Sequence, residues 1–268
     1  MEEKTFYKRV EYNSIETNYN IPEKCVQQYE NLNINKKLGE GSHGVVYNAH
    51  VNKSDKSLLS GSAINKSDKS LLSGSAINKS DKYVLKAVPL NVIIPSKYCD
   101  LKVKQGLLKC REVSDEEFDD EVKYSIIVSK ANVGPKVYKS WKCDNVKSQA
   151  HLELFKMKEI KMGFILMEKM EYTLDTYYNN KKLVKKNDKI LKEMYKDLIT
   201  IMLKNNISHK DLPFENIMIN IDKNKDPIKM RIIDWNSAKI LNSEEDTIEG
   251  YLEHWDKVIN VFYKQPYD

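Results

Sequence analysis

Arginine is scarce in this chain, and long apolar runs are missing. Only three of the 268 residues are arginine, against 41 lysines. Because arginine is the usual residue for bidentate contacts with phosphates and bases, its scarcity argues against a nucleic-acid partner despite the formal charge of +5. No apolar stretch approaches the roughly 18 residues that a membrane helix needs. We therefore expect neither a nucleic-acid partner nor a membrane span.

Cysteine is also scarce and follows no short pattern. Cys25, Cys99, Cys110 and Cys143 lie far apart without CxxC spacing, so neither a zinc site nor a disulfide framework is expected. The N-terminal stretch "MEEKTFYKRVEYN" has acidic residues and no apolar segment of the kind found in secretion signals. These absences predict a reducing compartment.

Apolar residues make up 41% of the chain, which is enough to bury one sizeable core or two small lobes. The sequence also contains a perfect repeat, "NKSDKSLLSGSAI", at 52–64 and 65–77, and a third copy begins at 78–82. Two copies of so short a unit cannot stack a core. Their Ser, Lys, Asp and Gly content predicts a solvated insertion. A docking or phosphorylation role for it stays open.

The first half of the chain has the pattern of a sheet with one helix. The stretch "INKKLGEGSHGVVYNAHV" alternates between apolar and polar residues and turns on glycines, and "YVLKAVPL" is a short apolar run rich in branched residues. Both patterns are typical of strands. Residues 114–130 place acids first and then apolar residues at helical spacing, which predicts a helix with Ser114 as its cap. Three apolar segments after Gly134-Pro135 are typical of further strands.

From about residue 170 the pattern becomes helical. Residues 187–205 carry an apolar stripe that favours core packing. Two short strand-like pieces, "IMINI" and "KMRIIDW", flank a polar turn, and the last 25 residues predict one closing helix. The predicted stripe consists of Ile190, Leu191, Met194, Leu198, Ile201 and Met202.

Three glycines, Gly39, Gly41 and Gly44, punctuate the strand–turn–strand pattern "LGEGSHGVVY". Without Cβ atoms, glycines let backbone amides approach phosphate oxygens closely. Alone, the pattern fits a tight hairpin equally well. Because a strand and not a helix follows, it favours a lid over nucleotide phosphates rather than a dinucleotide-binding unit.

Oxygen-bearing side chains stand in two later stretches. Asp211 and Asn216 lie five positions apart in "HKDLPFEN", and Asp234 lies in "IIDWNSAK". Carboxylate and amide oxygens are the ligands that Mg²⁺ prefers. Lys86, in the apolar run "YVLKAV", needs a carboxylate or phosphate nearby to keep its charge when buried. Singly, each of these residues also fits an ordinary turn, cap or edge-strand position.

In this order the motifs resemble those of the protein kinase superfamily, over roughly residues 32–240. The resemblance implies an ATP-dependent protein kinase that transfers the γ-phosphate to Ser or Thr hydroxyls of a protein substrate, with ATP and Mg²⁺ as cofactors. Asp211 would be the catalytic base. Asn216 and Asp234 would bind the metal ion.

The resemblance also implies a nucleotide site. Lys86 would pair with the α- and β-phosphates, and Glu121 of the predicted helix would be its partner, with Glu117 as the fallback. Met167 in "GFILMEKM" would limit the depth of the adenine pocket, and the backbone of Glu168 to Met170 would hydrogen-bond adenine. The full set implied for the nucleotide is Leu38, Gly39, Gly41, Ser42, Gly44, Val46, Lys86, Met167, Glu168 and Met170.

The implied fold is α+β and two-lobed, with a small antiparallel β-sheet N-lobe carrying one helix and a reduced, mainly helical C-lobe. We expect an N-terminal extension at 1–31, an N-lobe at 32–169 with the repeat insertion at 52–82, and a shortened C-lobe at 170–268. Only 34 residues follow Asp234 and no Ala-Pro-Glu motif is found, as in minimal kinases of viruses and bacterial effectors. A monomer in the cytoplasm, or in the host cytoplasm for a viral or effector protein, is expected.

Several residues depart from the family pattern. Pro213 stands where Ser/Thr kinases usually carry a lysine, Lys210 replaces an arginine, and Trp235-Asn236 replaces Phe-Gly. These departures leave open a pseudokinase-like module that binds nucleotide and acts by contacting another protein. The Ile-Asp-Trp context of Asp234 also leaves open a small-molecule kinase of the aminoglycoside or choline type. The complete glycine pattern favours the protein kinase.

Overall fold

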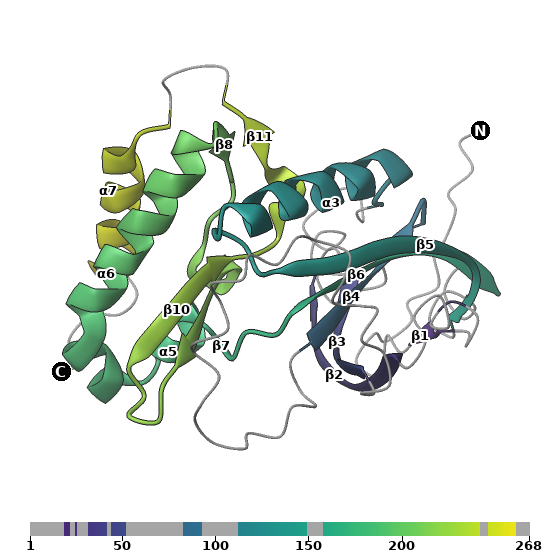
Figure 1. The fold of residues 1–268 in the computed structure, drawn as a ribbon, viewed down its shortest axis with the longest axis horizontal. Coiled ribbons are helices and arrows are strands. Elements are labelled where there is room, and N and C mark those ends of the chain that lie inside the picture. The colour runs from purple at the N-terminus through teal and green to yellow at the C-terminus, as the bar shows by residue number, and fades with distance from the viewer. Residues whose placement is uncertain are drawn as a thin grey trace, which may run out of the picture. The chain divides into compact units, whose positions relative to one another are not determined.

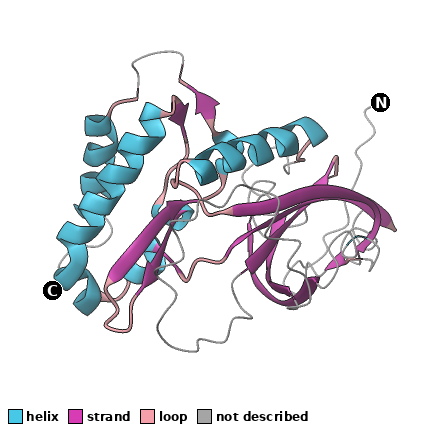
Figure 2. Cartoon of the chain, in the orientation of Figure 1, coloured by secondary structure: helices cyan, strands magenta, loops and turns pink. Residues whose placement is uncertain are grey.

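A computed structural model gives the structure of the chain as an α+β protein (Figures 1 and 2). The predicted repeat insertion and Ser42 lie outside the residues that it describes. Those residues are 19–21, 25, 32–41, 44–51, 83–92, 112–148, 158–241 and 246–260.

A six-stranded sheet contains the glycine-bearing strands, in the order β1-β5-β6-β4-β3-β2. Strand β4 lies between two neighbours, and seven of its eight residues are buried, which explains why its sequence is an almost continuous apolar run. Strands β2 and β3 pair antiparallel, with Gly41 opposite Gly44. The strands are β1 Tyr19–Asn20, β2 Leu32–Gly41, β3 Gly44–Val51, β4 Tyr83–Leu90, β5 Val137–Ser148 and β6 Glu159–Glu168.

The prediction that the cysteines form no disulfide is wrong. Cys25 and Cys143 are disulfide-bonded, with their Cα atoms 5.8 Å apart and a sequence separation of 118. The Trp141 indole N–H donates to the Cys25 carbonyl at 2.9 Å, and the Trp141 ring stacks on Phe164. Spacing rules detect only local cysteine patterns, whereas folding brings this distant pair together. Because a disulfide is present, the cysteines no longer indicate a reducing compartment.

Contacts divide the chain into two compact units, and most of the six-stranded sheet belongs to the first. The helix-bearing residues 116–140 are grouped with the C-terminal part of the chain. The predicted lobe boundary between residues 169 and 170 stays a prediction. The first unit comprises Met1–Ser80, Leu85–Asp115 and Trp141–Phe164, and the second comprises Asp81–Val84, Glu116–Ser140 and Ile165–Asp268.

The second unit combines helices with two small sheets (Figure 1). One sheet has the order β10-β9-β7, and β11 pairs with β8 in the other. The helices are α3 Asp115–Lys130, α5 Leu174–Tyr178, α6 Lys181–Lys204 and α7 Ile248–Val258. The strands are β7 Tyr172–Thr173, β8 Ile207–Ser208, β9 Ile217–Ile221, β10 Pro227–Ile232 and β11 Lys239–Ile240.

Aromatic side chains form the centre of the second unit's core. Trp255 of α7 is 1% exposed, and its ring centroid lies 4.6 Å from that of Tyr195 on α6 and 4.8 Å from that of Phe214. Burial of such rings is a large favourable term in folding. The predicted stripe on α6 is only partly correct, because Ile190 and Ile201 are exposed. None of the described helices is both long and apolar enough to cross a membrane.

Gly44 is required by packing, and Gly39 provides a matched control. The φ angle of Gly44 is +140°, and a Cβ atom there would lie 2.2 Å from the Ala87 carbonyl oxygen of β4. A Cβ on Gly39 would meet nothing within 4 Å. We expect Gly44→Ala to lower the free energy of unfolding by about 2 kcal/mol or more, and Gly39→Ala to change it by less than about 0.5 kcal/mol. Urea denaturation measures both, and equal effects would contradict the assignment.

Candidate functional site

The loop between β8 and β9 holds two of the predicted site residues, Asp211 and Asn216. Leu212 and Phe214 are buried in the core on the C-terminal side of Asp211, while Asp211 itself is exposed. The apolar neighbours therefore fix the loop and leave the Asp211 carboxylate at the surface. A short 3-10 turn, Phe214–Asn216, leads into β9.

His209 joins this loop to the end of β10. The His209 side chain is completely buried, and its Nε2 lies 2.8 Å from the Ile233 carbonyl oxygen. Since a carbonyl only accepts, Nε2 carries the proton. Burial lowers the pKa of His209, although the charges of Asp234 and Asp211 oppose that shift. The ring is therefore a neutral donor at pH 7, with Trp235 packed against it edge-on.

Backbone hydrogen bonds bring Asp211, Asn216 and Asp234 together. The Ile233 N–H donates to the Asn216 carbonyl at 2.9 Å, so Asn216 lies beside the residue that precedes Asp234. The Asn216 Nδ2 donates to the Asp211 carbonyl at 3.1 Å. Asp234 has left-handed backbone angles, φ 65° and ψ 61°. Such a conformation is uncommon outside glycine and is often found at functional sites.

The oxygen donors of this cluster suit a Mg²⁺ ion that arrives with a nucleotide. No group of three or more His, Cys, Asp or Glu residues that could hold a metal occurs among the described residues. Mg²⁺ at nucleotide sites needs only one or two protein carboxylates, because phosphates and waters fill the remaining positions. The Asn216 Nδ2 donates to the Asp211 carbonyl, so Oδ1 is the side-chain atom of Asn216 that could bind a metal ion.

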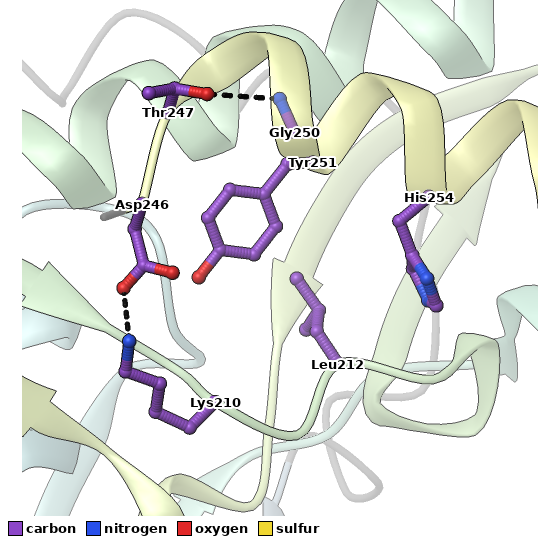
Figure 3. Close-up of a pocket in the computed structure, with 7 residues that line it drawn as sticks. All are labelled: Lys210, Leu212, Asp246, Thr247, Gly250, Tyr251 and His254. Carbon is purple, nitrogen blue, oxygen red and sulfur yellow. Dashed lines mark hydrogen bonds and ion pairs between the residues drawn. The ribbon is translucent and has the colours of Figure 1, made fainter. Parts of the chain in front are cut away.

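Lys210, next to Asp211 in the chain, is held by Asp246, as Figure 3 shows. Its φ angle is +58°, and its Nζ lies 2.5 Å from an oxygen of Asp246, just before α7. Burial alone would raise the pKa of Asp246, but hydrogen bonds from Lys210 and Ser208 lower it. The Tyr251 hydroxyl lies 3.2 Å from the Ser208 hydroxyl. These residues form one network that ties the first turn of α7 to the loop.

A cavity of about 270 Å³ lies beside this network (Figure 3). Sequence patterns did not single out Ser208, Asp246 or Tyr251. Asp246 belongs to an acidic run whose members are indistinguishable in sequence. The cavity is lined by Lys210, Leu212, Asp246, Thr247, Gly250, Tyr251 and His254.

Lys86 and Glu121 are buried charged residues in different units of the chain. Lys86 on β4 is 9% exposed and Glu121 on α3 is 3% exposed, and each has an interaction partner. Burial of a charge is costly unless it is paired. Glu117, the fallback partner, is exposed, so burial singles out Glu121 among the acids of α3.

The remaining predicted nucleotide residues fall in two groups. Leu38, Gly39, Gly41, Gly44 and Val46 belong to β2 and β3 of the first unit, where Leu38 is exposed and Val46 half-buried. In the second unit, the residues at the end of β6 and just beyond it are half-buried or buried. They are Met167, Glu168 and Met170.

No model of a known protein family matches the chain, and no curated protein matches it. The chemistry of the site itself is therefore the basis for a functional proposal.

The buried neutral His209 should make folding sensitive to acid. Its pKa in the folded chain lies below the ordinary value of 6.5, so below about pH 6.5 the unfolded chain binds a proton that the folded chain does not. Stability is present above that pH and is lost as the pH falls. We expect wild type to lose up to about 1.4 kcal/mol per pH unit more than His209→Gln between pH 6.5 and 5.5. Denaturant titrations at several pH values measure this, and parallel curves would contradict it.

Proposed function

We propose that the chain is an ATP-dependent protein kinase that transfers the γ-phosphate of ATP to Ser or Thr hydroxyls of a protein substrate. The observation that carries the proposal is the joint placement of Asp211, Asn216 and Asp234. Their order in sequence is the one expected of a phosphoryl-transfer site. Hydrogen bonds through His209 and Ile233 link the loop that carries Asp211 and Asn216 to the residue before Asp234.

In the proposed reaction, the substrate's hydroxyl oxygen forms a bond to the γ-phosphorus. The bond from that phosphorus to the oxygen bridging to the β-phosphate breaks, and ADP leaves with the bridging oxygen. The exposed Asp211 carboxylate accepts the hydroxyl proton. When bound between Asn216 and Asp234, Mg²⁺ supplies positive charge that offsets the charge on the transferring phosphoryl group.

In the proposed kinase, Lys86 and the glycines of β2 and β3 bind the nucleotide. A buried lysine supplies positive charge that is weakly screened, which suits the α- and β-phosphates. Glu121 is the proposed partner that keeps Lys86 charged. The exposed backbone around Gly39 has space for phosphate oxygens. The proposed kinase is a monomer that acts on a protein substrate. Neither nucleic acid nor a membrane is among its proposed partners.

A second candidate is a nucleotide-binding module that does not transfer phosphate. The Asn236 Nδ2 lies 3.3 Å from Asp234 Oδ1 and competes with a metal ion for that oxygen. Pro213, within the loop between β8 and β9, also supplies no cation to the transferred phosphate. This candidate would act by contacting another protein, and it differs from the kinase in turnover.

Transfer of labelled γ-phosphate to the protein itself and to a basic acceptor protein distinguishes the two candidates. We expect Asp211→Asn to lower kcat by roughly 10²–10⁴ and Asp234→Ala to abolish transfer. Asp256→Asn is the matched control, because Asp256 is an exposed acid on α7 paired with Lys192; its kcat should match that of wild type. Folded wild type that binds ATP without any transfer would refute the kinase and support the module.

Pro213→Lys tests whether a missing cation limits the transfer rate. Pro213 has φ −71° and ψ 166°, which any residue adopts, so lysine fits without backbone strain. A charge-assisted hydrogen bond is worth roughly 1.5–3 kcal/mol, so we expect kcat to rise by about tenfold. Pro213→Ala controls for the loss of the ring. An unchanged kcat in Pro213→Lys would mean that another group already supplies the charge.

A further inference from the structure

The last residue of β6 and the three residues that lead to β7, together the linker 168–171, are held at both ends by side chains. It is the segment whose backbone the proposed kinase would use to hydrogen-bond adenine. All of its tethers lie within the second unit. They come from the β9–β10 hairpin and from Lys136, just before β5.

At the first end, both carboxylate oxygens of Glu168 are engaged. Oε1 forms an ion pair with Lys229 Nζ on β10, and Oε2 accepts a hydrogen bond from the Lys136 N–H at 3.3 Å. The Glu168 N–H donates in return to the Lys136 carbonyl at 2.8 Å. Glu168 is therefore fixed through its main chain and its side chain together.

At the second end, Glu171 makes a reciprocal pair of hydrogen bonds with β9. Its N–H donates to Asn220 Oδ1 at 3.0 Å, and its Oε2 accepts from the Ile221 N–H at 3.0 Å. The next residue, Tyr172, pairs with Ile219 in the three-stranded sheet. The linker thus enters β7 with its backbone already aligned on β9.

The two tethering side chains belong to one cross-strand pair. Lys229 of β10 stands opposite Asn220 of β9 in the antiparallel register. Lys229 holds Glu168 and Asn220 holds Glu171, so the spacing of the two strands sets the separation of the linker's ends. A single cross-strand pair of the hairpin therefore supplies one side-chain tether at each end of the linker.

The surroundings of Glu168 strengthen its ion pair. Burial, and after it the neighbouring Tyr83 phenol and the Glu168 charge, raises the pKa of Tyr138 to about 12, so this ring stays neutral. Burial lowers the pKa of the half-buried Arg231, and the Glu168 charge opposes that shift. In such partly desolvated surroundings, charges are screened less than on an open surface.

We infer that Lys229 and Asn220 are positioning residues for the nucleotide, because they fix the backbone of the linker before the nucleotide binds. The inference rests on the proposed function, since it assigns adenine binding to that backbone. A linker fixed in advance loses little conformational freedom on binding, which increases affinity without any added contact. Neither residue needs to touch the nucleotide for this effect.

The first test is the affinity for Mg²⁺–ATP, measured by titration calorimetry, together with KM and kcat. Lys229→Met should raise the Kd and the KM for ATP by about tenfold and leave kcat within about twofold. Lys229→Arg should restore most of the affinity. Lys186→Met is the control, because Lys186 makes an exposed ion pair with Asp226 at the turn of the same hairpin. An unchanged Kd in Lys229→Met would overturn the inference.

The second test is hydrogen exchange at the Glu168 and Glu171 amides, which needs no nucleotide. Lys229→Met and Asn220→Ala should each speed exchange at these amides by about tenfold, while Lys186→Met should not. Unchanged exchange in both variants would overturn the inference even if the kinase proposal stands. Faster exchange in a protein that binds no ATP would overturn both the kinase proposal and the role in nucleotide binding. Lys229 and Asn220 would then serve only to hold the linker in place.

Discussion

The two backbone groups of Ile233 are the constraint on which the candidate site depends. Its N–H donates to the Asn216 carbonyl, and its carbonyl accepts from the His209 ring. Both ends of the loop from 209 to 216 are thereby fixed to the residue that precedes Asp234. Because buried backbone groups rarely remain unpaired, the loop cannot move away from Asp234 without a large cost. The proton on His209 Nε2 belongs to this constraint, since only a protonated Nε2 can donate to the carbonyl.

The β9–β10 hairpin connects this constraint to the linker. Ile232 pairs with Ile217 at one end of the hairpin, beside Asn216, and Lys229 pairs with Asn220 further along. A shift of one residue in this register would turn every side chain of one strand to the other face. If β9 turned in this way, Asn220 would separate from Glu171 and, with Met218, would be buried in place of Ile217 and Ile219. Burial of Ile217 and Ile219 therefore fixes the register that places Asn220 and Lys229 at the linker.

Sequence patterns predicted the parts of this arrangement that depend on local order. The strands on both sides of the turn and the helix containing Glu121 followed from periodicity. The roles of Asp211, Asn216 and Asp234 came from the resemblance to protein kinase motifs and stay a prediction. The Cys25–Cys143 disulfide and the pairing of Lys229 with Glu168 were not predictable, because they join residues that are distant in sequence and depend on strand register. The exposure of Ile190 and Ile201 was missed for a related reason. An apolar stripe marks one face of a helix but does not tell how much of that face its neighbours cover.

The Cys25–Cys143 disulfide closes a covalent ring, and the 13-residue repeats at 52–77 lie inside it in sequence. A backbone break anywhere between the two cysteines would leave one covalently connected molecule with two extra chain ends. Lys86 and the glycines of β2 and β3 would stay attached to the rest of the protein after such a break. The disulfide therefore keeps this part of the protein covalently joined even when the repeat segment is cut. A change in the number of repeats alters the size of the ring but does not open it.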